Sequence, residues 1–282
     1  QTIGMLTAEL VRSIESFVET QPRSIEEVAR LIKKNWRTAD KYLQEIEREH
    51  GTISVKVFRP GTRGALKIAY WSSVEKASST VFQELLEKDI MQGRKKEDFS
   101  EFDIFQLVKD KNKHASVENA AKEDLTDLDQ LVEIIRGTRK QLLIFSGNLS
   151  FINLKNKQIR IYDEVDCLIK RGVSIKVVCN IDLAGKENVE RMLSLNFKNA
   201  CEQIEIRHRE QPLRGMISDN KVIRIKEVKE PTGKIHELNK RTFIFYTIRD
   251  SEWALWLSRI FWKMFSASID ANKRIAELKK LR

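Results

Sequence analysis

Apolar positions near the start of the chain recur with a helical period. They predict one helix over Thr7–Thr20 and two shorter helices within residues 24–51. Ser24 and Glu27 have the spacing of a capping box, so the second helix begins at Ser24. Asn35 can cap the third helix and Gly51 can end it. The third helix keeps one apolar face, made by Ala39, Tyr42, Leu43 and Ile46. Two short helices joined by a turn of three or four residues have the layout of a helix-turn-helix.

The next twenty residues change to a period of two. Apolar residues alternate with polar ones in two runs, Ile53, Val55 and Val57, then Leu66, Ile68 and Tyr70, which predicts two strands with one buried face. Between them, residues 59–64 are rich in turn-forming residues and cations. Three helices followed by a basic hairpin resemble the winged helix-turn-helix domain of transcription regulators.

The residue types on the polar face of this region suit DNA. In a helix-turn-helix the N-terminal part of the second helix meets base edges in the major groove. Arg and Lys can bind guanine, Asn can pair with adenine, and Thr can contact the thymine methyl. The candidate residues in the turn and the second helix are Lys33, Lys34, Asn35, Arg37, Thr38 and Lys41. Candidate phosphate or minor-groove contacts of the wing are Arg59, Arg63 and Lys67. Two alternatives stay open: a solvated basic face on a structural helix pair, and a winged helix that binds only proteins.

A linking segment follows the hairpin. Apolar residues recur at helical spacing between Val74 and Met91, so a helix with an apolar stripe is expected there. The stripe could pack on its own domain or on the same helix of a second subunit; we favour the second, because two-fold dimers read paired half-sites. A charged stretch, residues 92–101, marks the domain boundary. Residues 102–122 could hold a helix and then a polar break.

The second half of the chain alternates short apolar strands with helices. This order is typical of an α/β layer structure, and the close spacing of the later strands favours a mixed sheet. Strands are expected at 141–146, 172–180, 203–208, 216–218, 222–228 and 242–248, and helices at 125–138, 159–170 and 188–195. The run from Asp250 to Arg282 is expected to be one long helix, whose first half is strongly apolar.

This second half resembles the phospholipase D-like fold. The similarity rests on a strand ending in Ser-Gly-Asn, then RGVSIKVV, then IEIRHREQPLRGMISDNKVIRI, and the closing TFIFYTIRDSEWALWLSRIFWKMF. A winged helix, a helical linker and such a domain resemble the TrmB-like transcription regulators, best known from archaea. The resemblance implies an α+β and α/β multidomain chain: a winged helix-turn-helix at 1–73, a helical linker at 74–122, a phospholipase D-like mixed-sheet domain at 123–265 and a C-terminal helical extension at 266–282.

The motif that catalytic members of the phospholipase D-like fold carry, H-x-K-x-x-x-x-D, is absent. The histidine position resembles Arg214 and the lysine position Met216, so the nucleophile for phosphodiester transfer is missing and no enzyme is expected. Arg214, Arg207 and His208 could still bind an anion, or could be surface cations at a strand edge. Three carboxylates, Asp163, Glu164 and Asp166, are interpreted as a solvated acidic face of a helix and not as a metal site.

Charge and composition indicate the kind of partner that the chain binds. The chain has 282 residues and a formal net charge of +10, which favours an acidic partner such as nucleic acid. Cys167, Cys179 and Cys201 form no CxxC pair and are expected to be buried free thiols. No apolar run approaches the roughly 18 residues of a membrane span. We therefore expect a cytoplasmic, nucleoid-associated homodimer that binds double-stranded DNA and needs no cofactor. Its role is that of a transcription regulator or a chromatin-like protein; the alternatives are a protein-interaction module and a nuclease. The operator and any effector stay open.

Overall fold

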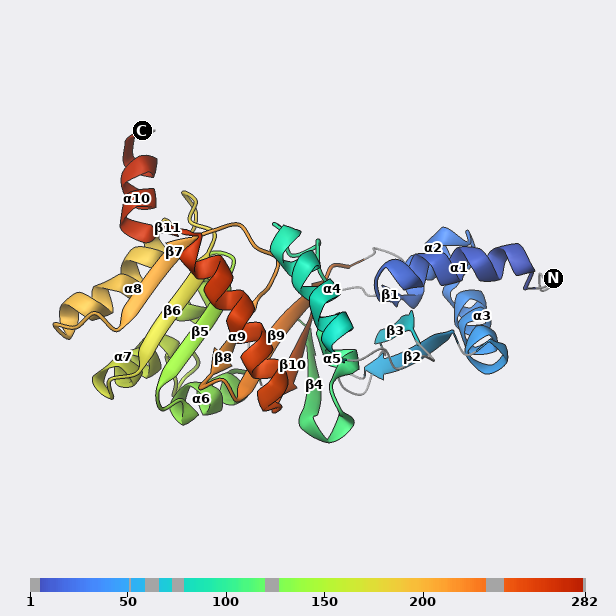
Figure 1. Cartoon of the computed structure of the whole chain (residues 1–282), viewed down its shortest axis with the longest axis horizontal. Helices are drawn as coiled ribbons and strands as arrows, with labels where there is room; N and C mark the ends of the chain where they lie inside the picture. The colour runs from blue at the N-terminus through green and yellow to red at the C-terminus, as the bar shows by residue number, and fades with distance from the viewer. Residues whose placement is uncertain are drawn as a thin grey trace. The chain divides into compact units, whose positions relative to one another are not determined.

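The computed structural model describes residues 6–50, 52–58, 66–72, 79–119, 127–231 and 241–280. The chain divides into two compact units (Figure 1). The N-terminal unit consists of Gln1–Phe82, Ser116–Ala121 and Val228–Phe243, and the C-terminal unit of Gln83–Ala115, Lys122–Glu227 and Ile244–Arg282.

The N-terminal unit packs three helices on a small antiparallel sheet. The helices are α1 (Ala8–Thr20), α2 (Ile25–Leu31) and α3 (Trp36–Glu49), and the sheet has the order β1 (Arg23–Ser24), β3 (Leu66–Trp71), β2 (Ile53–Phe58). The three predicted helices and two predicted strands are therefore present. Their apolar faces meet in one core, which includes Val11, Ile14, Val18, Val28, Ala39, Leu43, Ile46 and Ile53. The expected turn at residues 59–64 lies outside the described residues.

The sheet of the C-terminal unit is mixed, as predicted. Its order is β11-β7-β6-β5-β8-β9-β10-β4. Three neighbouring strands are parallel to one another: β5 (Gln141–Ser146), β6 (Ser174–Cys179) and β7 (Ile204–His208). The strands β8 (Gly215–Ser218) and β9 (Val222–Lys229) run antiparallel beyond β5. The remaining strands are β10 (Thr242–Ile248), β4 (Lys113–Asn119) and β11 (Ile269–Asp270).

Helices cover both faces of this sheet. On one face, α6 (Asp127–Gly137), α7 (Ile161–Lys170), α8 (Lys186–Lys198) and α10 (Ala271–Lys280) share a core with alternate residues of β5, β6 and β7, such as Ile144, Val177 and Ile206. On the other face, α9 (Ser251–Ser266) crosses the strands (Figure 1), and its Phe261 ring meets Phe145 of β5 edge to face. Two further helices are α4 (Ser79–Gln92) and α5 (Glu101–Leu107), and short 3₁₀ turns are η1 (Asp110–Asn112) and η2 (Ser150–Asn153).

The prediction of one helix from Asp250 to Arg282 is wrong. The helix α9 ends at Ser266, and Ile269 and Asp270 then pair with His208 and Arg207 of β7. The Asp270 carboxylate accepts hydrogen bonds from the backbone amides of Asn272 and Lys273 and so begins a separate helix, α10. The ambiguous segment 102–122 holds a helix, α5, and then the strand β4.

The expectation of buried thiols holds for only one of the three cysteines. Cys179 is buried at the end of β6, and burial raises the pKa of its thiol to about 12. Cys201 is half-buried, whereas Cys167 is exposed on α7. In the described part of the chain, no helix is long and apolar enough to cross a membrane.

Candidate nucleic-acid interface

The turn between α2 and α3 has the geometry of a Schellman motif. Lys33 takes up the left-handed conformation with a φ of 53°, which is uncommon for a residue other than glycine. Its backbone amide donates to the carbonyl of Arg30, and the Lys34 amide donates to the carbonyl of Ala29. Both hydrogen bonds fix the backbone of the turn. The side chains of the two lysines therefore project from fixed backbone positions, and both are exposed.

Asn35 and Thr38 serve the start of α3. The side-chain oxygen of Asn35, Oδ1, accepts hydrogen bonds from the Thr38 backbone amide at 2.9 Å and from the Thr38 hydroxyl at 3.1 Å. The predicted cap is therefore confirmed. The same oxygen would be needed for a bidentate contact with adenine, so in this conformation the two side chains fix the helix start instead of offering both groups to a base.

Cations without a carboxylate partner cluster at this helix start. Lys33, Lys34, Arg37 and Lys41 are exposed, and none makes an ion pair with another described residue. Arg37 and Lys41 are four residues apart and so lie on one face of α3. The opposite face, with Ala39, Tyr42, Leu43 and Ile46, is buried in the core. The guanidinium of Arg37 lies 5.5 Å from the centre of the Trp36 ring.

The predicted wing residues are placed only in part. Lys67 lies in β3, and its ammonium is 2.6 Å from the Asp40 carboxylate of α3. The lysine side chain is 27% exposed and that of the aspartate 15%. Because this pair is neutral, Lys67 offers a phosphate less charge than the four exposed cations do. Arg59 and Arg63 lie outside the described residues.

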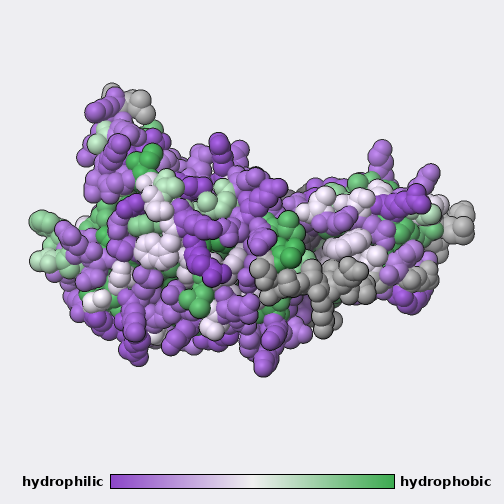
Figure 2. Space-filling model, in the orientation of Figure 1, coloured by the Kyte–Doolittle hydropathy of each residue, from purple (hydrophilic) through white to green (hydrophobic). Residues whose placement is uncertain are grey.

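The surface in view contains no large apolar area. Hydrophilic residues predominate over the face of the molecule drawn in Figure 2, and apolar groups appear there in small separate areas. Scattered apolar residues of this kind are normal on a soluble surface and do not mark a docking site.

At the position of the missing catalytic motif, the side chains of Met216 and Arg214 make packing contacts and hydrogen bonds within the fold. Met216 of β8 is 6% exposed and packs in the core between the sheet and the helices α6–α8. The Arg214 guanidinium donates to the carbonyls of Leu213 at 2.7 Å and Gln211 at 3.0 Å, and burial lowers its pKa. It also lies against Gly147, where a Cβ would come within 3.0 Å of its Nε. Neither residue supplies a nucleophile.

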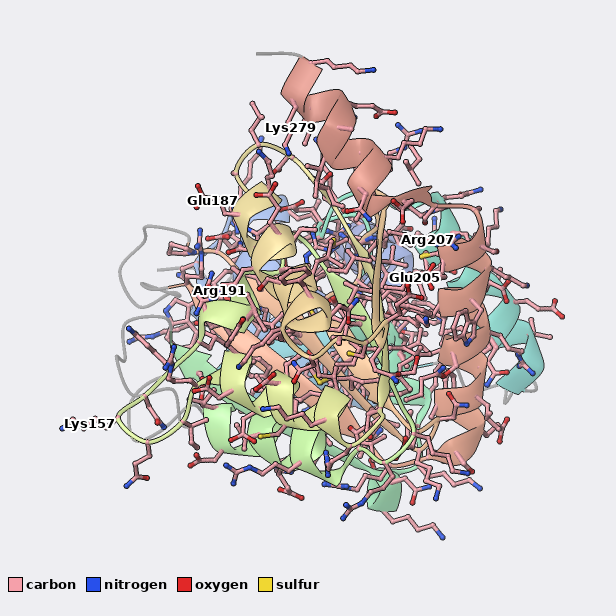
Figure 3. The ribbon with its side chains drawn as sticks, turned by 90° about the vertical axis from the view of Figure 1, so that its left-hand side faces the viewer. Lys157, Glu187, Arg191, Glu205, Arg207 and Lys279 are labelled. Atoms are coloured by element: carbon pink, nitrogen blue, oxygen red, sulfur yellow. The ribbon has the colours of Figure 1, made fainter. Side chains whose placement is uncertain are left out.

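Arg207 and His208, the other residues of the suggested anion site, have partners of their own. Arg207 donates to the Glu205 carboxylate, its neighbour on β7 (Figure 3), and to the carbonyl of Phe265. The His208 Nδ1 accepts a hydrogen bond from the Ile181 amide at 3.0 Å, and burial lowers the pKa of the imidazole. Arg214 is likewise hydrogen-bonded to the carbonyls of Gln211 and Leu213. All three side chains are therefore engaged in hydrogen bonds within the fold, and they do not point as free donors into one shared space.

The acidic residues of α7 are not one solvated face. Asp163 is exposed, but Glu164 pairs with Arg136 at 2.6 Å. Asp166 is buried and accepts hydrogen bonds from Lys170, Lys198 and Asn199. These hydrogen bonds connect α7 to α8. The described residues include no group of three or more His, Cys, Asp and Glu side chains that could hold a metal ion.

Comparisons with known proteins give only distant similarity. No protein-family model matches the sequence, and no curated protein matches it. Among solved structures, TrmBL2, described as an archaeal chromatin protein with a novel mode of DNA binding, has a TM-score of 0.38 at 15% identity, over 94% of each chain. NucT from Helicobacter pylori has a TM-score of 0.40 at 12% identity, over 56% of this chain and 99% of its own. The phospholipase D family member Nuc from Salmonella typhimurium has the same TM-score, identity and coverage of this chain, and 97% of its own chain is covered.

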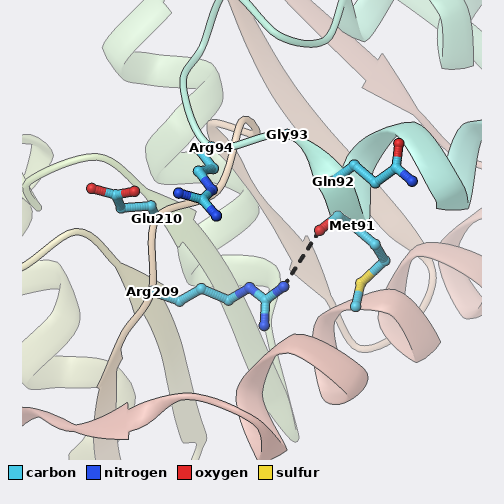
Figure 4. Close-up of a pocket in the computed structure, with 6 residues that line it drawn as sticks. All are labelled: Met91, Gln92, Gly93, Arg94, Arg209 and Glu210. Carbon is cyan, nitrogen blue, oxygen red and sulfur yellow. Dashed lines mark hydrogen bonds between the residues drawn. The ribbon is translucent and has the colours of Figure 1, made fainter.

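Sequence reasoning missed one place in the C-terminal unit. A cavity there is lined by Met91, Gln92, Gly93, Arg94, Arg209 and Glu210 (Figure 4). Its two arginines are separated by more than a hundred residues. Arg94 lies in the charged stretch 92–101 and Arg209 in the segment IEIRHREQPLRGMISDNKVIRI, but neither was a candidate site residue. The only signal in the sequence was the cationic character of the two segments.

Proposed function

We propose that this chain binds double-stranded DNA through its N-terminal unit, which acts as a winged helix-turn-helix. In this proposal α3 enters the major groove, and β2 and β3 form the wing. The observation that carries the proposal is a cluster of exposed cations that make no ion pair with another described residue: Lys33, Lys34, Arg37 and Lys41, on the turn before α3 and its first two turns.

The local structure supports this orientation. The buried face of α3 faces the core, so its cationic face is the one available to a groove about 12 Å wide. Lys33 and Lys34 are held by backbone bonds of the turn, which suits contacts to phosphates. Arg37 and Lys41 project from α3 itself, where side chains reach base edges. The cap made by Asn35 and Thr38 holds the helix start rigid, and this lowers the entropy lost on binding.

The charge of the whole chain favours the same partner. A net charge of +10 attracts a polyanion and raises the rate of encounter with it. Since base contacts add specificity to this attraction, two roles fit: a regulator that reads an operator, and a chromatin-like protein that coats DNA.

Binding of the full chain to DNA tests the proposal. A mixed-sequence duplex and fragments of the source genome are titrated at two salt concentrations. Tight binding to a few fragments that persists at the higher salt indicates a regulator, and similar, salt-sensitive binding to all fragments indicates a coating protein. The absence of binding to any duplex refutes the DNA-binding function.

Substitutions locate the interface. Arg37→Ala and Lys41→Ala are expected to weaken binding by about 1–3 kcal/mol each if the side chains contact bases. The matched control is Arg12→Ala, which removes an exposed arginine from α1 of the same unit. DNA affinity that is unchanged in the α3 variants would favour a protein-interaction module.

The proposal includes a homodimer joined through α4. Within α4, Leu86 and Ile90 are buried, but Val81 and Leu85 are 48% and 55% exposed. A second copy could cover these two side chains, as two-fold regulators require. Light scattering at micromolar concentration is expected to give twice the monomer mass; a monomer mass refutes the dimer and leaves DNA binding as a separate question.

A further inference from the structure

A cavity of about 450 Å³ opens in the C-terminal unit beside the end of α4. One side is formed by Met91–Arg94, the end of α4 and the residues after it, and the other by Arg209 and Glu210, which follow β7 (Figure 4). Cavities of a few hundred Å³ are the size of small-molecule sites.

The first wall is held in place before any ligand arrives. The Asp98 carboxylate accepts hydrogen bonds from the backbone amides of Arg94 at 2.8 Å and Lys95 at 2.9 Å. These bonds hold the pKa of Asp98 below its ordinary value. Gly93 lies so close to Pro212 that a Cβ would come within 2.8 Å of the proline ring. The backbone from which Arg94 projects is therefore fixed at both ends.

The second wall is fixed to the sheet. Arg209 directly follows β7, and its Nη2 donates to the carbonyl of Met91 at 3.4 Å. The Gln211 side chain is buried, and its amide nitrogen donates to the carbonyl of Ser146, at the carboxyl end of β5. In α/β sheets, ligands bind outside the carboxyl ends of parallel strands. The cavity lies at this edge.

The charges of the cavity select one kind of ligand. Arg94 and Arg209 extend toward the same space, while the Glu210 carboxylate points away from them (Figure 4). Neither arginine makes an ion pair with a described residue, and Arg209 has only a neutral carbonyl as its partner. Glu210 also lines the cavity, but its carboxylate is directed away from the two guanidinium groups, so the space beside both arginines is left for an anion.

We propose that this cavity binds a small molecule through a phosphate or carboxylate group gripped by Arg94 and Arg209. A guanidinium presents paired N–H donors that match both kinds of oxyanion, and the two residues approach the ligand from opposite walls. The hollow shape favours a small ligand over the backbone of a nucleic acid, which binds along an open groove.

The test measures anion binding by the full chain. Isothermal titration calorimetry uses inorganic phosphate and, in a separate arm, malonate, with sodium chloride at matched ionic strength as the reference. Saturable binding of one anion or both is expected, and the comparison tells which oxyanion the site prefers. If neither anion binds more than chloride does, the proposal is overturned.

Variants assign the binding to this cavity. Arg94→Gln changes an exposed side chain that makes no hydrogen bond or ion pair with the side chain or backbone of another described residue, and Arg209→Gln removes the opposite guanidinium. Each is expected to raise the Kd of the bound anion about tenfold. Arg259→Gln, on the exposed side of α9, is the control and is expected to leave the Kd unchanged, and Arg37→Gln tests whether the anion binds instead at the proposed DNA interface.

Each remaining outcome decides the question. Anion binding that is lost in Arg37→Gln but kept in Arg94→Gln and Arg209→Gln would place the anion at α3 and overturn the cavity. Loss in Arg94→Gln with an unchanged circular dichroism spectrum supports it, even if Arg209→Gln fails to fold. The result is independent of DNA binding, because the titrations contain no DNA.

Discussion

The salt dependence of DNA binding separates the exposed cations of α3 from the paired lysine of β3. The double variant Arg37→Gln and Lys41→Gln removes two charges that no described carboxylate offsets. Each neutralised phosphate contributes about 0.9 to the slope of log Kobs against log salt. The double variant is therefore expected to reduce the slope by about 1.8. Between about 50 and 200 mM salt, its affinity deficit relative to the parent then shrinks about tenfold.

The matched control also changes two side chains. Asp40→Asn with Lys67→Gln removes both members of the pair that lie 2.6 Å apart, so the local net charge stays the same. This variant is expected to keep the parent slope, because a neutral pair releases no counterion when DNA binds. The two double variants thus differ in charge at the interface and not in the number of substitutions.

Fluorescence anisotropy of a labelled duplex at four or more salt concentrations gives both slopes. Thermal unfolding of each variant shows whether the fold is intact. The reasoning is refuted if the slope of the Arg37 and Lys41 variant equals that of the parent, or if the Asp40 and Lys67 variant loses as much slope. The first result means that α3 does not contact phosphates, and the second that Lys67 leaves Asp40 to bind DNA.

Three further predictions concern stability. Asn35→Ala removes the cap of α3 and is expected to cost about 1 kcal/mol in urea unfolding, with weaker DNA binding; an unchanged midpoint contradicts the role of the cap. Gly215→Ala would place a Cβ 2.2 Å from the Arg224 carbonyl oxygen and is expected to cost about 3 kcal/mol or more, whereas Gly137→Ala, with open space around it, is expected to be tolerated; equal midpoints refute the close packing. Burial raises the pKa of Asp166, but its hydrogen bonds outweigh this effect and lower the pKa to about 2. The ionised carboxylate therefore stabilises the fold above about pH 4, and this stability is lost as the pH falls toward 2. In urea unfolding measured over a pH series, Asp166→Asn is expected to flatten this part of the curve.

The parts of the fold that the sequence predicted are those specified by neighbouring residues. The cap of α3 requires Asn35 and Thr38, three residues apart, and the capping box of α2 requires Ser24 and Glu27. Similarly, β5 and β6 contain short apolar runs, Leu142–Phe145 and Val177–Cys179, which is typical of strands buried on both faces, and β7 has alternating apolar residues, Ile204 and Ile206. Local spacing was sufficient for each of these elements.

The parts that escaped prediction depend on residues far apart. The two-residue strand β1 exists because Arg23 and Ser24 pair with Ala69 and Ile68. The strand β4 has the polar sequence KHASVEN, which carries no alternating apolar pattern, and it closes one edge of the large sheet. Asp40 and Lys67 are 27 positions apart in the sequence, so the composition of the residues around Lys67 could not show that its charge is paired.

The break between α9 and α10 shows how tertiary pairing overrides a helical pattern. Helical spacing of apolar residues continues across it, from Met264 and Phe265 to Ile275 and Leu278, and both ends are buried. No proline or glycine interrupts the sequence between them. The chain turns at residues 267–268 because the backbone of Ile269 and Asp270 can pair with the otherwise open edge of β7, and Asp270 then caps a new helix. The turn also returns α10 to the core with α8 and β7, where Ala271, Ile275 and Leu278 are buried. A continuous helix would leave both the sheet edge and these apolar side chains in water, so the broken helix is the more stable arrangement.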